Sequence, residues 1–250
     1  MSQTLEQGLK LLMHLADLSA TTEGAKVPLR ELAADCQLNK STAHRLLRSF
    51  AKFGLVEYDD GGRYALGVTP LLLARGAMRG NEFLRRAIPV VRHLAEETHE
   101  TVSLSERRDL QYVTVFEIES SHAIRYANKI GATSPLHAGA GCRAILAFSS
   151  LAIQSAVLKG PLQRLTANTI TDGKRLAKSL EGVRKAGYAV SFGERVPDTH
   201  SVAAPVLGSH GLSRGAISIL WPSRGAEVDR RRLRDWPALL KKSMENLQGI

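Results

Sequence analysis

The amino-acid sequence predicts an α+β protein with an N-terminal winged helix-turn-helix, a linker helix and a C-terminal α/β domain. Residues 1–67 show short helical patterns followed by a strand, a glycine-rich turn and a second strand. Residues 68–81 are helical and rich in leucine. Residues 82–250 alternate short strands with helices, which predicts a mainly antiparallel sheet flanked by helices.

The composition is that of a globular chain without a membrane span. Its 250 residues suffice for one large domain or two ordinary ones, and 44% of them are hydrophobic. No stretch approaches the roughly 20 apolar residues that cross a bilayer. Glu6 and Lys10 interrupt the N-terminal apolar run, which indicates an amphipathic helix rather than a signal peptide. Cys36 and Cys142 form no disulfide framework, so we expect a cytoplasmic protein.

The formal net charge of +10 suggests an anionic partner, but its distribution points away from the N-terminal segment. Residues 1–67 contain eight Lys+Arg and eight Asp+Glu, whereas residues 101–250 contain twenty-one and twelve. Any evidence for nucleic-acid binding at the N-terminus must therefore come from local pattern.

The segment LNKSTAHRLLRSFAKFGLVE, residues 38–57, predicts an amphipathic helix that begins near Lys40. At about 100° per residue its basic side chains fall on one face and its apolar ones on the other. Asn39 is the expected N-cap, with its side chain reaching the Thr42 amide. The first turn then presents polar groups at the positive end of the helix dipole, which suits a phosphate. The basic face comprises Ser41, Arg45, Arg48 and Lys52.

The flanking segments turn this helix into part of a DNA-binding motif. PLRELAADC predicts a preceding short helix, and only QLN separates the two, which is typical of a helix-turn-helix whose second helix enters the major groove of DNA. LVEYDDGGRYAL predicts a two-stranded wing with Arg63 at its tip. The alternatives are a solvated basic face or a domain that binds protein. Candidate contacts to double-stranded operator DNA are Lys40, Ser41, Thr42, His44, Arg45, Arg48, Lys52 and Arg63.

The remaining elements follow in order along the chain. A helix is expected at about residues 69–80, and its leucines either pair with a second copy or pack on the wing. TVSLSER, LQYVTVFEIES and HAIRYANKIG predict strands, followed by a helix at GCRAILAFSS and another, with an aspartate cap, at TDGKRLAKSLEGVRKAG. YAVSFGER, HSVAAPVLG and GLSRGAISILW predict three more strands, and EVDRRRLRDWPALLKKSMENL a closing helix.

LRELAADCQLNKSTAHRLLRSFAKFGLVEYDDGGRYALG resembles the DNA-binding motif of the IclR-type family of bacterial transcriptional regulators. Gln37 stands where that family usually has glycine, and Asn39 where it usually has proline. In the second half, SPLHAGAGCRAILA, HSVAAPVL and GAISILWPS resemble the family's ligand-pocket segments. The resemblance implies a GAF-like effector-binding domain for a small carboxylic or aromatic acid. It also implies homodimers or homotetramers that control catabolic operons.

The resemblance also implies which residues bind the effector. Cys142 replaces a family glycine, Ser201 replaces a cysteine, and Trp221 follows Leu220 where serine and glycine are usual. The segment around Phe192 lacks an acidic pair common in the family. We therefore expect a more apolar pocket and a larger, aromatic-like acid. The candidate residues are Gly139, Ala140, Gly141, Cys142, Ser201 and Ser218, with Arg125 and Leu136 as weaker candidates.

The alternative hypothesis is a GAF-like enzyme or metal-binding protein that carries a DNA-binding domain. Cys142 and His137 are a conceivable nucleophile and base, and His137, His200 and a carboxylate a conceivable metal site. The chain has no metalloprotease, Cys-x-x-Cys, P-loop or nucleophile-elbow motif. We expect neither enzymatic activity nor a cofactor. The arginines at residues 230–234 are interpreted as a solvated helix face.

Overall fold

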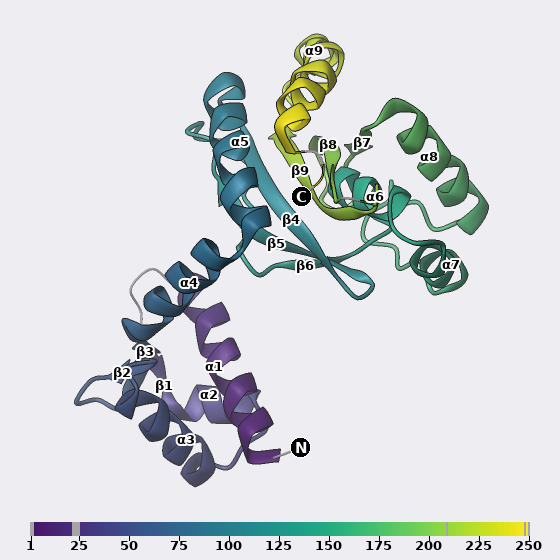
Figure 1. Ribbon diagram of the computed structural model, residues 1–250. Helices are drawn as coiled ribbons and strands as arrows, with labels where there is room; N and C mark the ends of the chain where they lie inside the picture. Colours follow the sequence, from purple (N-terminus) through teal and green to yellow (C-terminus); the bar gives the residue numbers. More distant parts are fainter. Residues whose placement is uncertain (1–2, 22–25, 209, 248, 250) are drawn as a thin grey trace. The chain divides into compact units, whose positions relative to one another are not determined.

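The computed structural model describes residues 3–21, 26–208, 210–247 and 249 (Figure 1). Parts of the predicted ranges that fall on residues 1–2, 22–25, 209, 248 and 250 lie outside the described residues. The chain divides into two compact units, residues 1–81 and 82–250. None of the described helices is long and apolar enough to cross a membrane.

The first unit is a winged helix-turn-helix, as the sequence predicts. Leu11 and Leu15 of the first helix meet Leu32, Leu47 and Tyr64 in one buried core. The wing strands pair antiparallel in the order β1-β3-β2. The elements are α1 (Gln3–Thr21), β1 (Val27–Pro28), α2 (Leu29–Asp35), α3 (Lys40–Lys52), β2 (Val56–Tyr58) and β3 (Arg63–Leu66).

The turn between α2 and α3 is tight, and one non-glycine residue adopts a left-handed backbone there. Gln37 has φ +54°, a region that L-residues other than glycine seldom occupy. The Gln37 amide donates to the Ala34 carbonyl at 3.0 Å and the Leu38 amide to the Ala33 carbonyl at 2.8 Å. These bonds close the end of α2 and bring the chain round to the start of α3.

Helix α4 (Thr69–Gly80) has no buried residue within the described chain. Leu71, Leu72 and Leu73 are 69%, 59% and 62% exposed. The helix thus exists at the predicted place, but it is not packed on the wing through its leucines. Three consecutive exposed leucines are unusual for a surface that meets only water.

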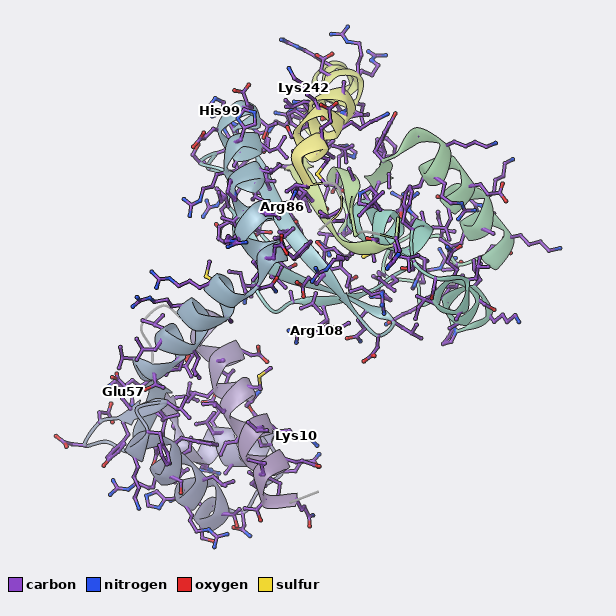
Figure 2. The ribbon with its side chains drawn as sticks, viewed as in Figure 1. Lys10, Glu57, Arg86, His99, Arg108 and Lys242 are labelled. Carbon is purple, nitrogen blue, oxygen red and sulfur yellow. The ribbon has the colours of Figure 1, made fainter. Side chains whose placement is uncertain are left out.

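The second unit is built on one six-stranded antiparallel sheet in the order β6-β5-β4-β9-β8-β7. Arg108, labelled in Figure 2, marks the end of β4 at its hairpin with β5. A register shift interrupts the β4–β5 ladder between Leu104 and Ser105. The strands are β4 (Thr101–Arg108), β5 (Gln111–Ile118), β6 (Thr133–Pro135), β7 (Ala189–Phe192), β8 (Thr199–Leu207) and β9 (Ser213–Pro222).

Helices cover both faces of this sheet and enclose two hydrophobic cores (Figure 1). On one face α5 and α9 pack through residues such as Phe83, Leu94 and Leu240. On the other face α6, α7 and α8 pack through residues such as Ile145 and Leu180. The helices are α5 (Glu82–Thr98), α6 (Ala140–Ala147), α7 (Leu151–Lys159), α8 (Gly173–Ala186) and α9 (Ala226–Met244), followed by a short 3-10 turn, Glu245–Leu247.

Two sequence-based assignments need correction. HAIRYANKIG, residues 122–131, forms no strand, because the chain there leaves the sheet and the edge position beside β5 is taken by β6. The Thr101 hydroxyl instead donates to the Tyr126 carbonyl at 2.5 Å and holds this segment over the sheet. Helix α7, whose N-cap Ser150 accepts a hydrogen bond from the Ile153 amide, was not predicted.

Candidate functional site

The second helix of the helix-turn-helix presents its basic face to solvent. Ala43 and Leu47 are fully buried against the other helices, so the opposite side of α3 is left free. Thr42 is partly exposed, and the other seven candidate DNA contacts are exposed. These seven are Lys40, Ser41, His44, Arg45, Arg48, Lys52 and Arg63.

The N-terminus of α3 is capped as predicted. The Thr42 amide donates to Asn39 Oδ1 at 2.8 Å, and the Ser41 hydroxyl donates to the same oxygen at 2.9 Å. Asn39 therefore performs the usual N-cap role at a position where the resemblance expects proline. The remaining free amides of the first turn point to solvent at the positive end of the helix, where a phosphate is favoured.

Arg48 links the helix to the wing. Its guanidinium lies 4.8 Å from the centre of the Tyr58 ring, and Nη1 donates to the Tyr58 hydroxyl. At the wing turn the Arg63 amide donates to Asp59 Oδ1 at 3.0 Å, which fixes the hairpin while the Arg63 side chain stays exposed. Arg48 thus joins the exposed basic face of α3 to the wing.

In the second unit, six of the eight predicted effector residues line one small cavity between α6 and the sheet. Ser201 and Leu220 pair across β8 and β9, and Ser191 pairs with Ser201 across β7 and β8, so the ladder brings these side chains to one sheet face. The cavity itself encloses about 20 Å³, room for one water. Its lining is Tyr112, Tyr126, Gly139, Ala140, Gly141, Cys142, Ser191, Arg195, Val196, Thr199, Ser201, Ser218 and Leu220.

A buried ion pair holds the loop that begins α6. Arg143 Nη2 donates to Glu194 Oε1 at 2.5 Å, and Nη1 donates to the Ser179 hydroxyl at 2.6 Å. The other oxygen of Glu194 accepts the Gly139 amide at 3.1 Å. Gly139 has φ +100° and ψ 158°, a conformation for which glycine is suited. Glu194 therefore occupies one amide of this helix start and leaves those further along the first turn to the cavity.

Gly141 is the point of closest approach between α6 and the sheet. A Cβ on this residue would lie 2.7 Å from Ser218 Oγ and 2.9 Å from Tyr112 Cε2. The Ser218 hydroxyl is buried and has no hydrogen-bond partner in the described chain. Leaving a buried hydroxyl unpaired costs about 1–3 kcal/mol, so a polar ligand atom here would remove a penalty.

The cavity lining contains one arginine, Arg195, which was not predicted from the sequence. Its Nη2 donates to Asn128 Oδ1 at 2.5 Å and to the Tyr126 hydroxyl at 3.2 Å. The guanidinium also lies over the rings of Tyr112 and Tyr126, at 5.3 and 5.9 Å from their centres. No sequence motif marks an arginine in the β7–β8 loop, and only the folded chain brings it to these tyrosines.

Two weaker candidates and two aromatic residues lie elsewhere. Arg125 is exposed and pairs with Glu119 at 3.0 Å, and its neighbour Tyr126 lines the cavity instead. Leu136 is buried beside a separate cleft. Trp221 is a core residue that meets Trp236 edge to face, and Phe192 is exposed. These two residues therefore do not line the cavity, and the tyrosines supply its aromatic surface.

The arginines of α9 also differ from the sequence-based interpretation. Arg230, Arg231 and Arg234 are exposed as expected. Arg232 instead donates to the fully buried carboxylate of Glu100 at 2.7 Å, because α9 lies against the end of α5. This arginine has a structural partner.

The residues considered for catalysis or metal binding are not assembled for either. Burial raises the pKa of Cys142 to about 11, so its thiol is uncharged near neutral pH. His137 Nε2 lies 2.8 Å from the Gln163 carbonyl, and His200 is near Asp229. No group of three metal-ligating side chains occurs among the described residues.

Both units match protein families. The family described as bacterial transcriptional regulator IclR C-terminal matches residues 76–247, and the IclR helix-turn-helix domain matches residues 4–60. The chain is 28% identical over 232 residues to the transcriptional repressor IclR of Escherichia coli (strain K12), covering 91% of this chain and 83% of that protein. It is 31% identical over 214 residues to the regulator BhcR of Paracoccus denitrificans (strain Pd 1222), covering 84% and 76%.

Solved structures agree with this match. The IclR transcriptional regulator of Alicyclobacillus acidocaldarius superposes with a TM-score of 0.83 at 27% identity, covering 96% of each chain. An IclR homologue of Microbacterium hydrocarbonoxydans, crystallised with 4-hydroxybenzoate, has the same fold with a TM-score of 0.81 at 20% identity, covering 98% of each chain.

The relatives regulate transcription, and this chain is likewise a regulator and not an enzyme. Its two units correspond to the DNA-binding and effector-binding parts of such proteins. The chain belongs to the IclR family of bacterial transcriptional regulators.

Proposed function

We propose that this regulator binds double-stranded operator DNA through α3 and the wing, and that a small carboxylic acid bound in the second unit controls that binding. The protein would act in the bacterial cytoplasm on a catabolic operon. The observation on which the DNA-binding role rests is the exposed basic face of α3 above a buried apolar face.

The geometry of α3 supports different contacts for its different basic side chains, some to bases and some to phosphates. Arg45 lies free on the exposed face, where an arginine inserted into the major groove reads guanine through paired hydrogen bonds. Lys52, in the last turn of α3, and Arg63, at the wing tip, are placed to meet phosphates. Arg48 is held by Tyr58, so its position is fixed before DNA arrives.

The cavity between α6 and the sheet supports the ligand assignment. It combines a glycine-containing helix start with isolated hydroxyls and an arginine, which together suit a carboxylate. The Microbacterium relative binds 4-hydroxybenzoate, a flat aromatic acid. Tyr112 and Tyr126 offer aromatic faces to a ligand of that shape.

Self-association follows from the same account. One recognition helix reads only a few base pairs, and a two-fold pair doubles the site. The exposed leucines of α4 are the surface we assign to a homodimer, and pairs of dimers would give a homotetramer. Sedimentation at micromolar concentration should show at least a dimer, and a monomer with full operator affinity would contradict this.

The DNA-binding role is tested by selecting duplexes from a random pool with the full chain and then measuring affinity at matched salt. Arg45→Ala should weaken binding to the selected duplex by about 1–3 kcal/mol, the value of one base contact. Arg230→Ala, which removes an exposed arginine from the other unit, is the control and should leave affinity unchanged. If no duplex is enriched, or if both variants bind alike, the assignment is wrong.

A further inference from the structure

The cavity of the proposed effector site is too small for the ligand it should hold. About 20 Å³ accommodates a single water, whereas pockets for small organic ligands measure roughly 300–1,000 Å³. A second cleft of about 580 Å³ lies between β5, β6 and α7. Arg195 belongs to the lining of both spaces, so its side chain stands between them.

Half of the fourteen residues that line the larger cleft have apolar side chains. Its apolar side chains come from the turn before β5, the end of β6 and the residue after it, α7, and the chain that follows α7. They are Leu110, Pro135, Leu136, Ala156, Val157, Pro161 and Leu165. Such a wall suits the hydrocarbon or aromatic body of a ligand rather than its charge.

Arg195 supplies a positive charge without a carboxylate partner. Among the described residues, no carboxylate lies within ion-pair distance of its guanidinium, and its two hydrogen bonds go to the neutral Asn128 and Tyr126 oxygens. The adjacent Glu194 turns the other way and pairs with Arg143. A guanidinium has five donor hydrogens and is always charged, so donors remain for an anion that meets it as a fork.

The unpaired hydroxyl of Ser218 is a second, independent sign of a polar ligand atom. It is buried, lies on the cavity wall and has no hydrogen-bond partner in the described chain. The Tyr112 ring lies beside Gly141, which also approaches the Ser218 hydroxyl. The Arg195 guanidinium lies over the same ring. Ser218 and Arg195 line the same cavity.

We propose that Arg195 anchors the carboxylate of the effector, and that the apolar body of the same molecule lies in the cleft lined by Leu136 and α7. The proposal rests on the function proposed above and names its ligand class, a monocarboxylic acid with an apolar or aromatic body. The guanidinium then makes a forked pair of hydrogen bonds to the carboxylate.

The charge is tested with the full chain and matched acid and amide probes. The probes are benzoate with benzamide, 4-hydroxybenzoate with 4-hydroxybenzamide, and hexanoate with hexanamide, with binding measured by thermal shift and calorimetry. At least one acid should bind, and its amide should bind about 10- to 100-fold more weakly, the value of hydrogen bonds to a charged group. Arg195→Met should bind the acid more weakly than the wild type by the same factor. Arg175 is an exposed arginine on α8, and Arg175→Met should bind the acid with wild-type affinity.

Folding of each variant is checked by its melting curve without ligand. Arg195→Lys keeps the charge but not the fork, and should bind the acid with an intermediate affinity even if Arg195→Met does not fold. Ala156→Phe should block the cleft and weaken acid binding with Arg195 intact, while Ala152→Phe, on the same helix and outside the cleft lining, should not.

The outcomes separate the two proposals. An acid that binds wild type and the Arg195 variants equally would overturn the anchor and leave acid sensing in place. Equal binding of acid and amide would overturn the anchor as well. No binding by any acid of the panel would contradict both the anchor and the proposed effector class.

Discussion

Adding one methyl group at Gly141 tests the packing of the cavity directly. A Cβ would approach Ser218 Oγ to 2.7 Å and Tyr112 Cε2 to 2.9 Å, both closer than real contacts allow. Overpacking of this kind costs about 1–3 kcal/mol. Gly141→Ala should therefore lower the free energy of unfolding of the second unit by about 2 kcal/mol.

The two contacts can be separated with a double-mutant cycle. Ser218→Ala removes the closer of the two atoms and leaves Tyr112 in place, so Gly141→Ala should cost only about 1 kcal/mol in that background. We therefore predict an interaction energy of about 1 kcal/mol between the substitutions at residues 141 and 218, which is the difference between the two costs of Gly141→Ala. Leu220→Ala, a cavity residue on the same strand that makes neither close contact, is the control background.

Tryptophan fluorescence during urea unfolding measures this without interference from the first unit. The chain has two tryptophans, Trp221 and Trp236, and both lie in the second unit. Each single substitution and the pair are compared at one pH and salt concentration. A Gly141→Ala cost that is the same with and without the Ser218 hydroxyl would show that Gly141 does not face this hydroxyl as described.

Three further substitutions test other parts of the account. Gln37→Gly should stabilise the first unit in calorimetric melting by about 0.5–1 kcal/mol, because glycine adopts φ +54° without strain, whereas Gln37→Ala should give no gain. Burial raises the pKa of the Glu117 carboxyl to about 7, against the opposing effect of Asn128. The stability contributed by the neutral carboxyl is thus fully present below about pH 4.5 and is lost as the pH rises through 7. Glu117→Gln should therefore raise the free energy of unfolding by about 1–2 kcal/mol at pH 9, after allowance for solvent screening, and by little at pH 4.5. An equal increase at both pH values would refute the raised pKa. Lys52→Ala should reduce the slope of log binding constant against log salt concentration by about one unit, as the loss of one phosphate contact does. An unchanged slope would show that Lys52 does not contact a phosphate.

The exposed basic face of α3 could be predicted because its signals are local. The spacing of the basic residues in α3 fixes their common face, and Asn39 caps the helix three residues before the amide it binds. The turn residue Gln37 also adopts the left-handed conformation that a family glycine would supply. Each of these depends on residues within one or two helical turns.

The residues that line the cavity between α6 and the sheet were predicted only where they are continuous in sequence or belong to a strand motif. The loop at 139–142, Ser201 and Ser218 were found in this way. Tyr112 was missed because it lies on β5, outside the segments whose resemblance supplied the candidate residues. The ladder pairs Tyr112 with Arg107 and, after the extra residue Val115, Glu117 with Ser103, so both side chains lie on the sheet face toward α6. Arg195 and Tyr126 come from irregular loops, which carry no periodic signal.

The central claim is that an acid bound in the second unit changes operator affinity, and a paired binding measurement tests it. A selected duplex is titrated with wild type and Gly141→Val, with and without the acid that stabilises wild type most. The acid should change wild-type operator affinity about 5- to 150-fold, the usual range of allosteric coupling. Gly141→Val should bind the duplex normally without acid and lose both acid binding and its effect, because the larger side chain fills the cavity against Ser218 and Tyr112. If a folded Gly141→Val protein still responds to the acid like wild type, the ligand binds elsewhere and the account is contradicted.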